Sequence, residues 1–372
     1  MGKKIFIYGY IGKEITGIGR CLIETLKAMA EIEPECSFVL YTNYDNLKLG
    51  NSLTSLKARF ITVKYFPVSK NSTVLNLISN TLAMPFLVLY EKADLIYLPN
   101  IVPILFHFRP VVTVIHDLIE FRIKKKFSFL RILYRSFALP RMANVAKRII
   151  TVSHNSKKDI IELLHIDPNK ITVIYNGAPQ PEIYRTKKKV VNYNYILHVG
   201  TVDHPGKNLY NTIKAFELFK SKSKSVVKLV ICGQPGKGFQ IIEQLILASK
   251  FNYDILYLGY VNQAELIDYY KNATGFVFIS YYEGFGLPIL EAMSYGIPVI
   301  TANRSSLPEV AGDAAILCDP DNLQEISQAM AQVTEYEILR QELIAKGFKN
   351  LQRFSWKQTA SKTLKIFNEQ LT

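Results

Sequence analysis

The stretch E-G-F-G-L-P-I-L-E, residues 283–291, decides the fold of the second half of the chain. An apolar run, 275–280, comes directly before it and predicts a buried parallel strand. Gly284 and Gly286 let backbone or ligand approach without a Cβ in the way, and Pro288 suits the first turn of a helix. The stretch therefore predicts a tight turn from a strand into a helix.

The first turn of such a helix is a site for an anion. Its N–H groups have no partner within the helix and point into the crevice at the carboxyl ends of the strands, where they favour a phosphate. Glu283 and Glu291 would repel that phosphate unless they bind something else. A carboxylate accepts from two neighbouring hydroxyls, so the pair could hold the sugars at the two ends of a diphosphate. The alternative is that both are solvated surface acids.

Length and composition favour a two-domain enzyme-sized chain. The 372 residues exceed one ordinary core, and a hydrophobic content of 49% is enough for two. We expect no signal peptide and no transmembrane helix, because the most apolar stretch, 74–90, is interrupted by polar residues and a proline. The four cysteines show no pairing or metal-binding spacing, which indicates reduced thiols of a cytosolic protein.

The positive charge is concentrated in the first half. Met1 to Tyr175 contains 24 Lys or Arg and 13 Asp or Glu, a net charge of +11, whereas the remainder has 21 against 18, a net of +3. A basic half indicates an anionic partner: nucleic acid, a membrane surface or a phosphorylated substrate. Nucleic acid is disfavoured, because the sequence has no zinc-finger spacing, helix-turn-helix pattern or aromatic RNA-binding signature.

The first half alternates strands and helices. Strands at 4–8, 38–41 and 59–66, with a helix at 19–31, predict a doubly wound parallel sheet. The glycine-rich loop 9–20 is too long for a dinucleotide fingerprint, and no acid follows the second strand, so a nicotinamide enzyme is disfavoured.

His116 follows a predicted strand at 111–115. The carboxyl end of a parallel strand lies at the crevice where ligands bind, so a functional role is favoured over a structural one for this histidine.

The segment 121–148 is the most unusual of the chain. Lys124-Lys125-Lys126 come first, and Arg131 and Arg135 lie off the apolar face of the predicted helix that follows. That face consists of Leu130, Leu133, Tyr134 and Phe137. Two interpretations stay open: an interfacial helix on anionic lipid, or a core-facing helix with a solvated basic side.

The second domain opens with a strand at 195–201 and a glycine-containing turn before a helix. Lys207, at the start of that helix, is the cation that this turn offers to a phosphate.

Two motifs resemble the retaining family-4 glycosyltransferases of the GT-B fold: the two glutamates within E-G-F-G-L-P-I-L-E-A-M-S-Y-G-I-P-V-I, and L-P-E-V-A-G-D-A-A at 307–315. The resemblance implies two facing Rossmann-like domains with parallel sheets and an interdomain cleft. It implies an acceptor-binding domain at 1–178, with the last helix, about 357–372, packing back onto it. The nucleotide-sugar domain would be 190–356.

The resemblance also implies roles for single residues. Glu291 would hold the nucleotide ribose, Glu283 would lie near the donor sugar, the amides after Phe285 would hold the diphosphate, and His116 would be the donor-sugar histidine. The predicted catalytic residues are His116, Lys207 and Glu283. The predicted donor-binding residues are Gly17, Gly19, Arg20, Gly200, Thr201, Lys207, Val261, Glu283, Phe285, Gly286, Leu287 and Glu291.

The chain departs from the family pattern in the turn before Lys207. Where the family often has Arg and a further basic residue, this chain has Thr201 and Gly206, which leaves Arg20 as a candidate second cation. Thr at that place occurs in branches thought to use GDP-mannose, so GDP-mannose is the favoured donor, with UDP- and dTDP-sugars as alternatives.

We therefore expect a retaining transfer of a hexosyl group, mannose or similar, in capsule, O-antigen or other surface polysaccharide synthesis. The expected acceptor is a glycan linked to a lipid diphosphate, and the expected location is cytoplasmic, peripheral on the inner face of the plasma membrane. We expect no cofactor, no metal and no nucleic acid. The alternatives are an inactive membrane-surface scaffold, a transferase with a small soluble acceptor, and an epimerase or phosphorylase of the same two-domain plan.

Overall fold

The computed structural model describes residues 2–9, 17–32, 35–42, 60–66, 73–102, 104, 106–123, 127, 129–180 and 191–371, with the backbone alone for 73–80 and 131. The predicted loop residues 10–16 and Lys124–Lys126 lie outside the described residues. The chain divides into two compact units. Unit 1 comprises Met1–Leu118, Phe127–Gly177 and Ser355–Thr372, and unit 2 comprises Ile119–Lys126 and Ala178–Phe354.

Unit 1 is built on a seven-stranded parallel sheet in the order β3-β2-β1-β4-β5-β6-β7. Its central strands are apolar and buried along their whole length, as expected where helices cover both faces. The strands are β1 (Lys4–Tyr8), β2 (Ser37–Thr42), β3 (Ile61–Tyr65), β4 (Leu95–Leu98), β5 (Val111–Ile115), β6 (Arg148–Thr151) and β7 (Ile171–Val173). The predicted doubly wound parallel sheet is confirmed.

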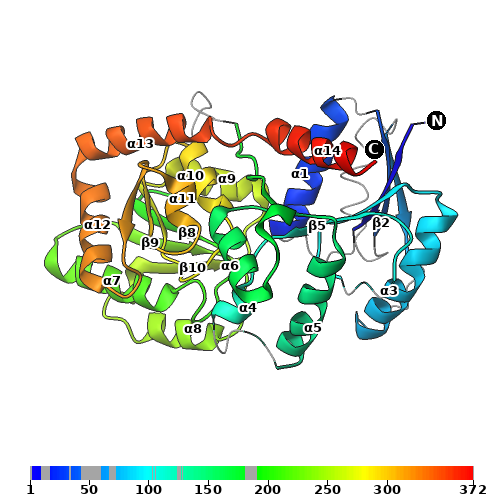
Figure 1. Ribbon diagram of the computed structural model, residues 1–372. Coiled ribbons are helices and arrows are strands. Elements are labelled where there is room, and N and C mark those ends of the chain that lie inside the picture. The colour runs from blue at the N-terminus through cyan, green and yellow to red at the C-terminus, as the bar shows by residue number, and fades with distance from the viewer. Residues whose placement is uncertain are drawn as a thin grey trace. The chain divides into compact units, whose positions relative to one another are not determined.

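The helices of unit 1 lie on both faces of this sheet. They are α1 (Gly17–Ile32), α3 (Thr73–Tyr90), α5 (Phe129–Val145), α6 (His154–Leu164) and α14 (Trp356–Leu371), with the 3-10 turn η2 (Pro168–Lys170). The connection through α1 crosses the strand order in the opposite direction from those through α3 and α5. Because such crossovers are right-handed, α1 covers one face, and α3 and α5 cover the other (Figure 1).

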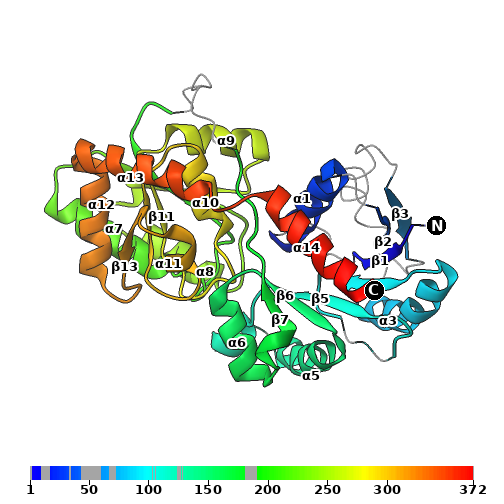
Figure 2. The ribbon, with the colours of Figure 1, turned by 45° about the horizontal axis from the view of Figure 1, so that its top comes forward.

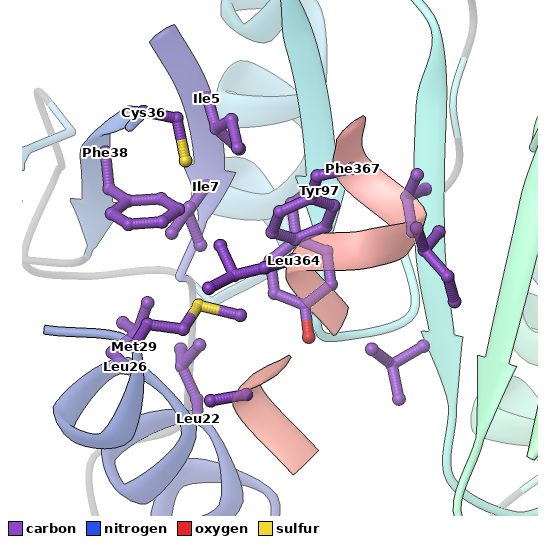
Figure 3. Close-up of a cluster of buried hydrophobic side chains, with 14 of the residues drawn as sticks. Ile5, Ile7, Leu22, Leu26, Met29, Cys36, Phe38, Tyr97, Leu364 and Phe367 are labelled. Atoms are coloured by element: carbon purple, nitrogen blue, oxygen red, sulfur yellow. The ribbon is translucent and has the colours of Figure 1, made fainter. Parts of the chain in front are cut away.

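The core of unit 1 joins the two ends of the chain. Helix α14 packs beside α1 (Figures 1 and 2). Leu364 and Phe367 of α14 enter a buried cluster with strand β1, and the Phe367 ring meets Tyr97 edge to face at 5.0 Å (Figure 3). The last helix is therefore part of unit 1, although the whole of unit 2 precedes it in the sequence.

Unit 2 is built on a six-stranded parallel sheet in the order β10-β9-β8-β11-β12-β13. The strands are β8 (Tyr195–Val199), β9 (Lys228–Cys232), β10 (Ile255–Gly259), β11 (Gly275–Phe278), β12 (Val299–Ala302) and β13 (Ala315–Cys318). The helical elements are α4 (Ile119–Arg122), α7 (Leu209–Lys222), α8 (Phe239–Leu247), η3 (Asn252–Asp254), α9 (Gln263–Asn272), α10 (Leu287–Ser294), α11 (Leu307–Ala311), α12 (Leu323–Glu335) and α13 (Glu337–Leu351).

The order of this sheet fixes where a ligand site forms in unit 2. From β8 the chain moves outward to β9 and β10, then returns to β11 on the other side of β8. The strand order reverses between β8 and β11, and the carboxyl ends of two such strands border the crevice in which open α/β sheets bind ligands.

The structure also bears on the predictions for the cysteines and for membrane-spanning helices. All four cysteines are free and buried, as predicted, and burial raises the pKa of Cys21 to about 12. Across the described parts of the chain, no helix has the length and apolar character needed to span a membrane.

Candidate active site

The turn after β8 is fixed to the turn after β9 by backbone hydrogen bonds. Gly200 N–H donates to the Cys232 carbonyl at 3.0 Å, and Val202 N–H donates to the Gln234 carbonyl at 2.9 Å. The carbonyl of Gly200 packs so closely on Gly233 that a Cβ there would stand 1.8 Å from its oxygen. The turn that carries Gly200, Thr201 and Lys207 is thus held rigidly before any ligand binds.

Lys207 is positioned at both ends of its side chain. Its N–H donates to Asp203 Oδ1 at 2.9 Å, which closes the turn at the start of α7. Its ammonium nitrogen Nζ lies 2.6 Å from Glu283 Oε1 and 5.1 Å from the centre of the Phe278 ring. Both charged side chains are largely buried. The structure therefore brings together two residues that the sequence predicts as catalytic.

The turn 283–286 is clamped by two serines that the sequence interpretation missed. Ser305 Oγ accepts from the N–H of Glu283 at 2.8 Å and lies 2.9 Å from its carbonyl oxygen. Ser306, which is completely buried, lies within 2.9 Å of the carbonyl oxygens of Glu283 and Phe285. In the sequence they appear only as two adjacent polar residues before the Leu-Pro pair that starts a helix. Many loops share this pattern.

Helix α10 begins at Leu287, directly after this turn, as the sequence predicts. Gly286 caps it with φ 113°, a backbone conformation that favours glycine, and a Cβ there would meet Leu307 at 3.0 Å. Phe285 is buried against the ring of Phe354. The first turn of a helix can offer backbone N–H groups to an anion, and in this one the Ile289 N–H already donates to the Gly286 carbonyl at 3.0 Å.

Glu291 lies one turn into α10 and is buried. Its Oε2 accepts from the hydroxyl of Tyr270 at 2.8 Å, and the Tyr270 ring stacks on Tyr295. A carboxylate held in this way keeps its second oxygen in a fixed direction, which suits the recognition of hydroxyls. Glu291 is therefore not one of the solvated surface acids of the alternative interpretation.

His198, on β8, lies beneath the Gly200 turn and was not among the predicted site residues. It is completely buried, its Nδ1 lies 3.0 Å from the Val277 carbonyl, and burial lowers its pKa to about 4. The neutral ring therefore donates from Nδ1 and presents a lone pair at Nε2. Within the described part of the chain, His198 Nε2 and Ser280 Oγ have no hydrogen-bond partner. A buried histidine inside an apolar strand gives no sequence signal that separates it from core.

The remaining donor-loop predictions lie at the same edge of the sheet. Thr201 is exposed, next to Gly200, and Leu287 is half-buried in the first turn of α10. Val261 is half-buried directly before Asn262, whose side chain caps α9 by accepting from the Glu265 N–H.

Unit 1 carries the other predicted site residues at the carboxyl edge of its own sheet. His116 follows β5, its Nε2 lies 3.3 Å from the Pro99 carbonyl, and burial lowers its pKa. It lines a cavity of about 30 Å³ together with Cys21 of α1. Gly17, Gly19 and Arg20 form the first turn of α1, which begins two residues before the predicted helix 19–31.

The chemistry open to the unit 2 residues follows from their charge. A helix N-terminus and an ammonium group stabilise a phosphate, and the two glutamates can accept hydrogen bonds from hydroxyls. Over the described ranges, no group of three or more His, Cys, Asp or Glu side chains is arranged to hold a metal ion.

Comparison with known families agrees with this geometry. The model described as "Glycosyl transferases group 1" matches residues 179–350, and the model described as "Glycosyltransferase Family 4" matches residues 15–179.

Two curated relatives are similar over much of the chain. O-antigen chain mannosyltransferase B of Escherichia coli is 32% identical over 265 residues, which cover 69% of each chain. O-antigen chain mannosyltransferase RfbU of Salmonella typhimurium is 28% identical over 219 residues, 56% of this chain and 60% of the relative.

Among solved structures, Anabaena Alr3699/HepE in complex with UDP-glucose superposes with a TM-score of 0.77 at 18% identity, covering 98% of this chain and 99% of that one. This likeness shows the fold and confirms the predicted GT-B class. With motif, fold, family models and relatives in agreement, the chain is a glycosyltransferase that belongs to glycosyltransferase family 4.

Proposed function

We propose that this enzyme transfers a hexosyl group from a nucleotide-sugar to a glycan acceptor during surface polysaccharide synthesis, with retention of anomeric configuration. The observation that carries the proposal is the contact of 2.6 Å between Lys207 and Glu283 beside the N-terminus of α10. The Lys207 ammonium can bind the diphosphate of a nucleotide-sugar, and the Glu283 carboxylate can bind hydroxyls of its sugar. The contact brings these two groups together.

Lys207 and Glu283 exchange partners in the proposed reaction. In the structure each neutralises the other. When a donor binds, the Lys207 ammonium turns to the diphosphate, and Glu283 accepts from hydroxyls of the sugar. As the bond between sugar and diphosphate breaks, the negative charge on the departing diphosphate grows, and Lys207 and the α10 amides stabilise it. Retention follows if the acceptor hydroxyl attacks on the face that the diphosphate leaves, as the family resemblance implies, and passes its proton to the departing diphosphate oxygen.

The other site residues receive roles in the same scheme. Glu291, buried and held by Tyr270, binds the ribose. Gly200, Thr201 and Val261 border the nucleotide. In unit 1, His116 serves the donor sugar, and Gly17, Gly19 and Arg20 serve the diphosphate. These assignments rest on the match of each position to the family motif.

Mannose from GDP-mannose is the favoured donor. The supporting facts are the names of the two curated relatives, both O-antigen chain mannosyltransferases. The Anabaena neighbour was solved with UDP-glucose, which keeps UDP-sugars as the alternative.

The acceptor is proposed to be a glycan linked to a lipid diphosphate, reached by peripheral binding to an anionic membrane. The support comes from α5, where Leu130, Leu133 and Phe137 are exposed and Tyr134 is half-buried. The first half of this helix is thus not core-facing, which was the alternative at the sequence level. Its basic neighbours favour anionic lipid, with each cation near the surface contributing about 1 kcal/mol.

The test is a panel of GDP-, UDP- and dTDP-sugars with a lipid-linked and a water-soluble acceptor, read as release of nucleoside diphosphate and product configuration by NMR. We expect turnover with GDP-mannose and the lipid-linked acceptor, an α-anomeric product from the α-linked donor, and no loss in EDTA, because the transfer is proposed to need no metal. Inverted product, or activity lost in EDTA and restored by Mg²⁺ or Mn²⁺, would contradict the scheme. Turnover only with the soluble acceptor, or none with any donor, would favour the two alternatives of a soluble acceptor or an inactive scaffold.

A further inference from the structure

Unit 1 gathers its exposed large hydrophobic side chains on three segments of the chain. Among the described residues, every exposed large hydrophobic side chain of unit 1 comes from α3, the segment 106–108 or α5. The ten side chains, 39% to 77% exposed, are Leu82, Phe86, Leu89, Tyr90, Phe106, Phe108, Phe129, Leu130, Leu133 and Phe137. A soluble chain rarely gathers so many on one face unless the face is an interaction surface.

The exposed residues follow one stripe on each helix. On α3 they fall at positions i, i+4, i+7 and i+8 from Leu82, and on α5 at i, i+1, i+4 and i+8 from Phe129. With a turn every 3.6 residues, each set lies on a single face of its helix. Both helices lie on the same side of the sheet, opposite α1 and α14 (Figure 1).

The segment between β4 and β5 contacts both helices. The Phe86 ring of α3 meets Phe106 edge to face at 6.0 Å, and Phe106 meets Phe108 at 5.9 Å. On its other side the same segment bonds to α5, where Arg141 donates to the Ile104 carbonyl at 2.5 Å. We call the ten side chains on α3, 106–108 and α5 the apolar face. The ring contacts join its α3 part to 106–108, and the Arg141 bond fastens the same connecting segment to α5.

Unit 1, which carries the apolar face, is basic as a whole. It contains 23 Lys or Arg against 13 Asp or Glu, a net charge of +10, and α3 contains no charged residue. Arg109 is exposed beside Phe108, and Arg135 is half-buried in α5. An apolar and aromatic face on a basic unit matches the interface of an anionic bilayer, where acyl chains receive the apolar side chains and headgroups attract the cations.

The same charges disfavour a second copy of this chain as the occupant. A two-fold symmetric dimer would place the apolar face against itself, and with it two copies of unit 1, each of net charge +10. Like charges brought together across an interface oppose association.

We propose that the apolar face inserts into the interface of an anionic phospholipid bilayer, with α3 and the Phe106–Phe108 segment as a second contact beside α5. This deepens the proposed function, because a lipid-linked acceptor requires the enzyme at the bilayer. The sequence pattern of α5 alone suggested binding through charge. The structure adds an aromatic part that salt does not screen, so binding has one salt-sensitive and one salt-resistant component.

The test is flotation with vesicles of phosphatidylcholine, with and without phosphatidylglycerol, at low and high salt. The variant Phe86→Ser/Phe106→Ser/Phe108→Ser changes exposed rings only, and circular dichroism checks its fold. We expect the wild type to retain measurable binding to the anionic vesicles at high salt, and the variant to bind them at least about tenfold more weakly, which corresponds to about 1.4 kcal/mol. The matched control, Leu247→Ser/Tyr253→Ser/Ile338→Ser, removes three side chains of unit 2 that are at least as exposed, and it should bind as the wild type does.

Equal binding of the wild type and the aromatic variant would overturn the proposal. So would a wild-type dimer in light scattering that the variant abolishes, because a second copy would then cover the apolar face. Release of nucleoside diphosphate from the donor, assayed without lipid in the same preparations, reports on the proposed function separately. A protein that releases nucleoside diphosphate but does not bind vesicles would contradict membrane insertion alone. A protein that binds vesicles but releases no nucleoside diphosphate would contradict the proposed transfer.

Discussion

Two regions differ in how firmly their functional side chains are fixed. One is the carboxyl edge of the unit 2 sheet, which carries Lys207 and Glu283 and is called the crevice edge below, and the other is the apolar face of unit 1. At the crevice edge, Lys207 and Glu283 are largely buried and paired, and serines and backbone bonds fix the turns that carry them. On the apolar face, large side chains such as Phe129 and Leu130 are about three-quarters exposed. A small charged donor needs groups fixed in advance, whereas a bilayer needs only area and charge.

The largest effect should come from removing the ammonium at the crevice edge. We expect Lys207→Ala to lower kcat by about 10² to 10³, the loss typical of one charge-stabilising donor. Steady-state transfer at saturating donor measures it, with Lys214→Ala as control because that lysine pairs with Glu217 on the surface of α7. Turnover near that of the wild type would remove Lys207 from the reaction.

Glu291→Gln should weaken the donor rather than slow the reaction. Its carboxylate accepts from Tyr270 and is proposed to accept from the ribose. Loss of a hydrogen bond to a charged group costs about 1.5 to 3 kcal/mol, so KM for the donor should rise about tenfold or more while kcat changes little. Glu217→Gln serves as control. A fall in kcat at constant KM would instead assign Glu291 to the chemical step.

The neutral His198 beneath the same edge makes stability depend on pH. Burial lowers its pKa to about 4 in the folded chain, against about 6.5 for an ordinary histidine. At a pH between these two values, the histidine binds a proton in the unfolded chain but not in the folded chain. Stability therefore falls as the pH falls from about 6.5 toward 4. Between about pH 7 and about pH 5 the wild type should lose about 2 kcal/mol more than His198→Gln. Urea unfolding at both values measures this difference, and equal losses would contradict a neutral, buried His198.

The smallest effect concerns the serine clamp. Ser306→Ala removes a buried hydroxyl that lies within hydrogen-bond distance of the carbonyls of Glu283 and Phe285. We expect the free energy of unfolding to drop by about 1 kcal/mol, the typical net contribution of one hydrogen bond, with a modest loss of activity. Ser221→Ala, an exposed hydroxyl that bonds within its own helix, should change it little. If both variants unfolded alike, the turn 283–286 would not depend on the clamp.

Local pattern predicted much of the crevice edge. The apolar run, glycines and proline of 275–291 predicted the strand, turn and helix that the structure has, because those residues act on their own backbone. The contact of Lys207 with Glu283 spans 76 positions, and no local rule pairs two such residues. The close approach of Gly200 to Gly233 depends in the same way on which strands become neighbours.

The apolar face was harder to predict for a different reason. An amphipathic pattern shows that α5 has an apolar side but not whether a sheet covers it. In the structure Leu139 and Met142, in the second half of α5, are buried, while Leu130 and Leu133 in the first half are exposed. From its sequence, the stretch 74–90 was interpreted only as too polar to span a membrane. Which of its side chains are exposed depends on the side of α3 that packs on the sheet.

The central claim is that unit 2 holds the donor between Lys207 and the start of α10. Binding of a nucleoside diphosphate without its sugar tests this claim most directly. Calorimetric titration of GDP, UDP and dTDP would first identify the one that the wild type binds most tightly. For that ligand, Lys207→Ala should raise Kd about tenfold or more. His116→Ala, which changes a residue of unit 1 proposed to meet only the sugar, should leave Kd unchanged. A Kd that Lys207→Ala does not alter, or that His116→Ala raises as much, would contradict the account.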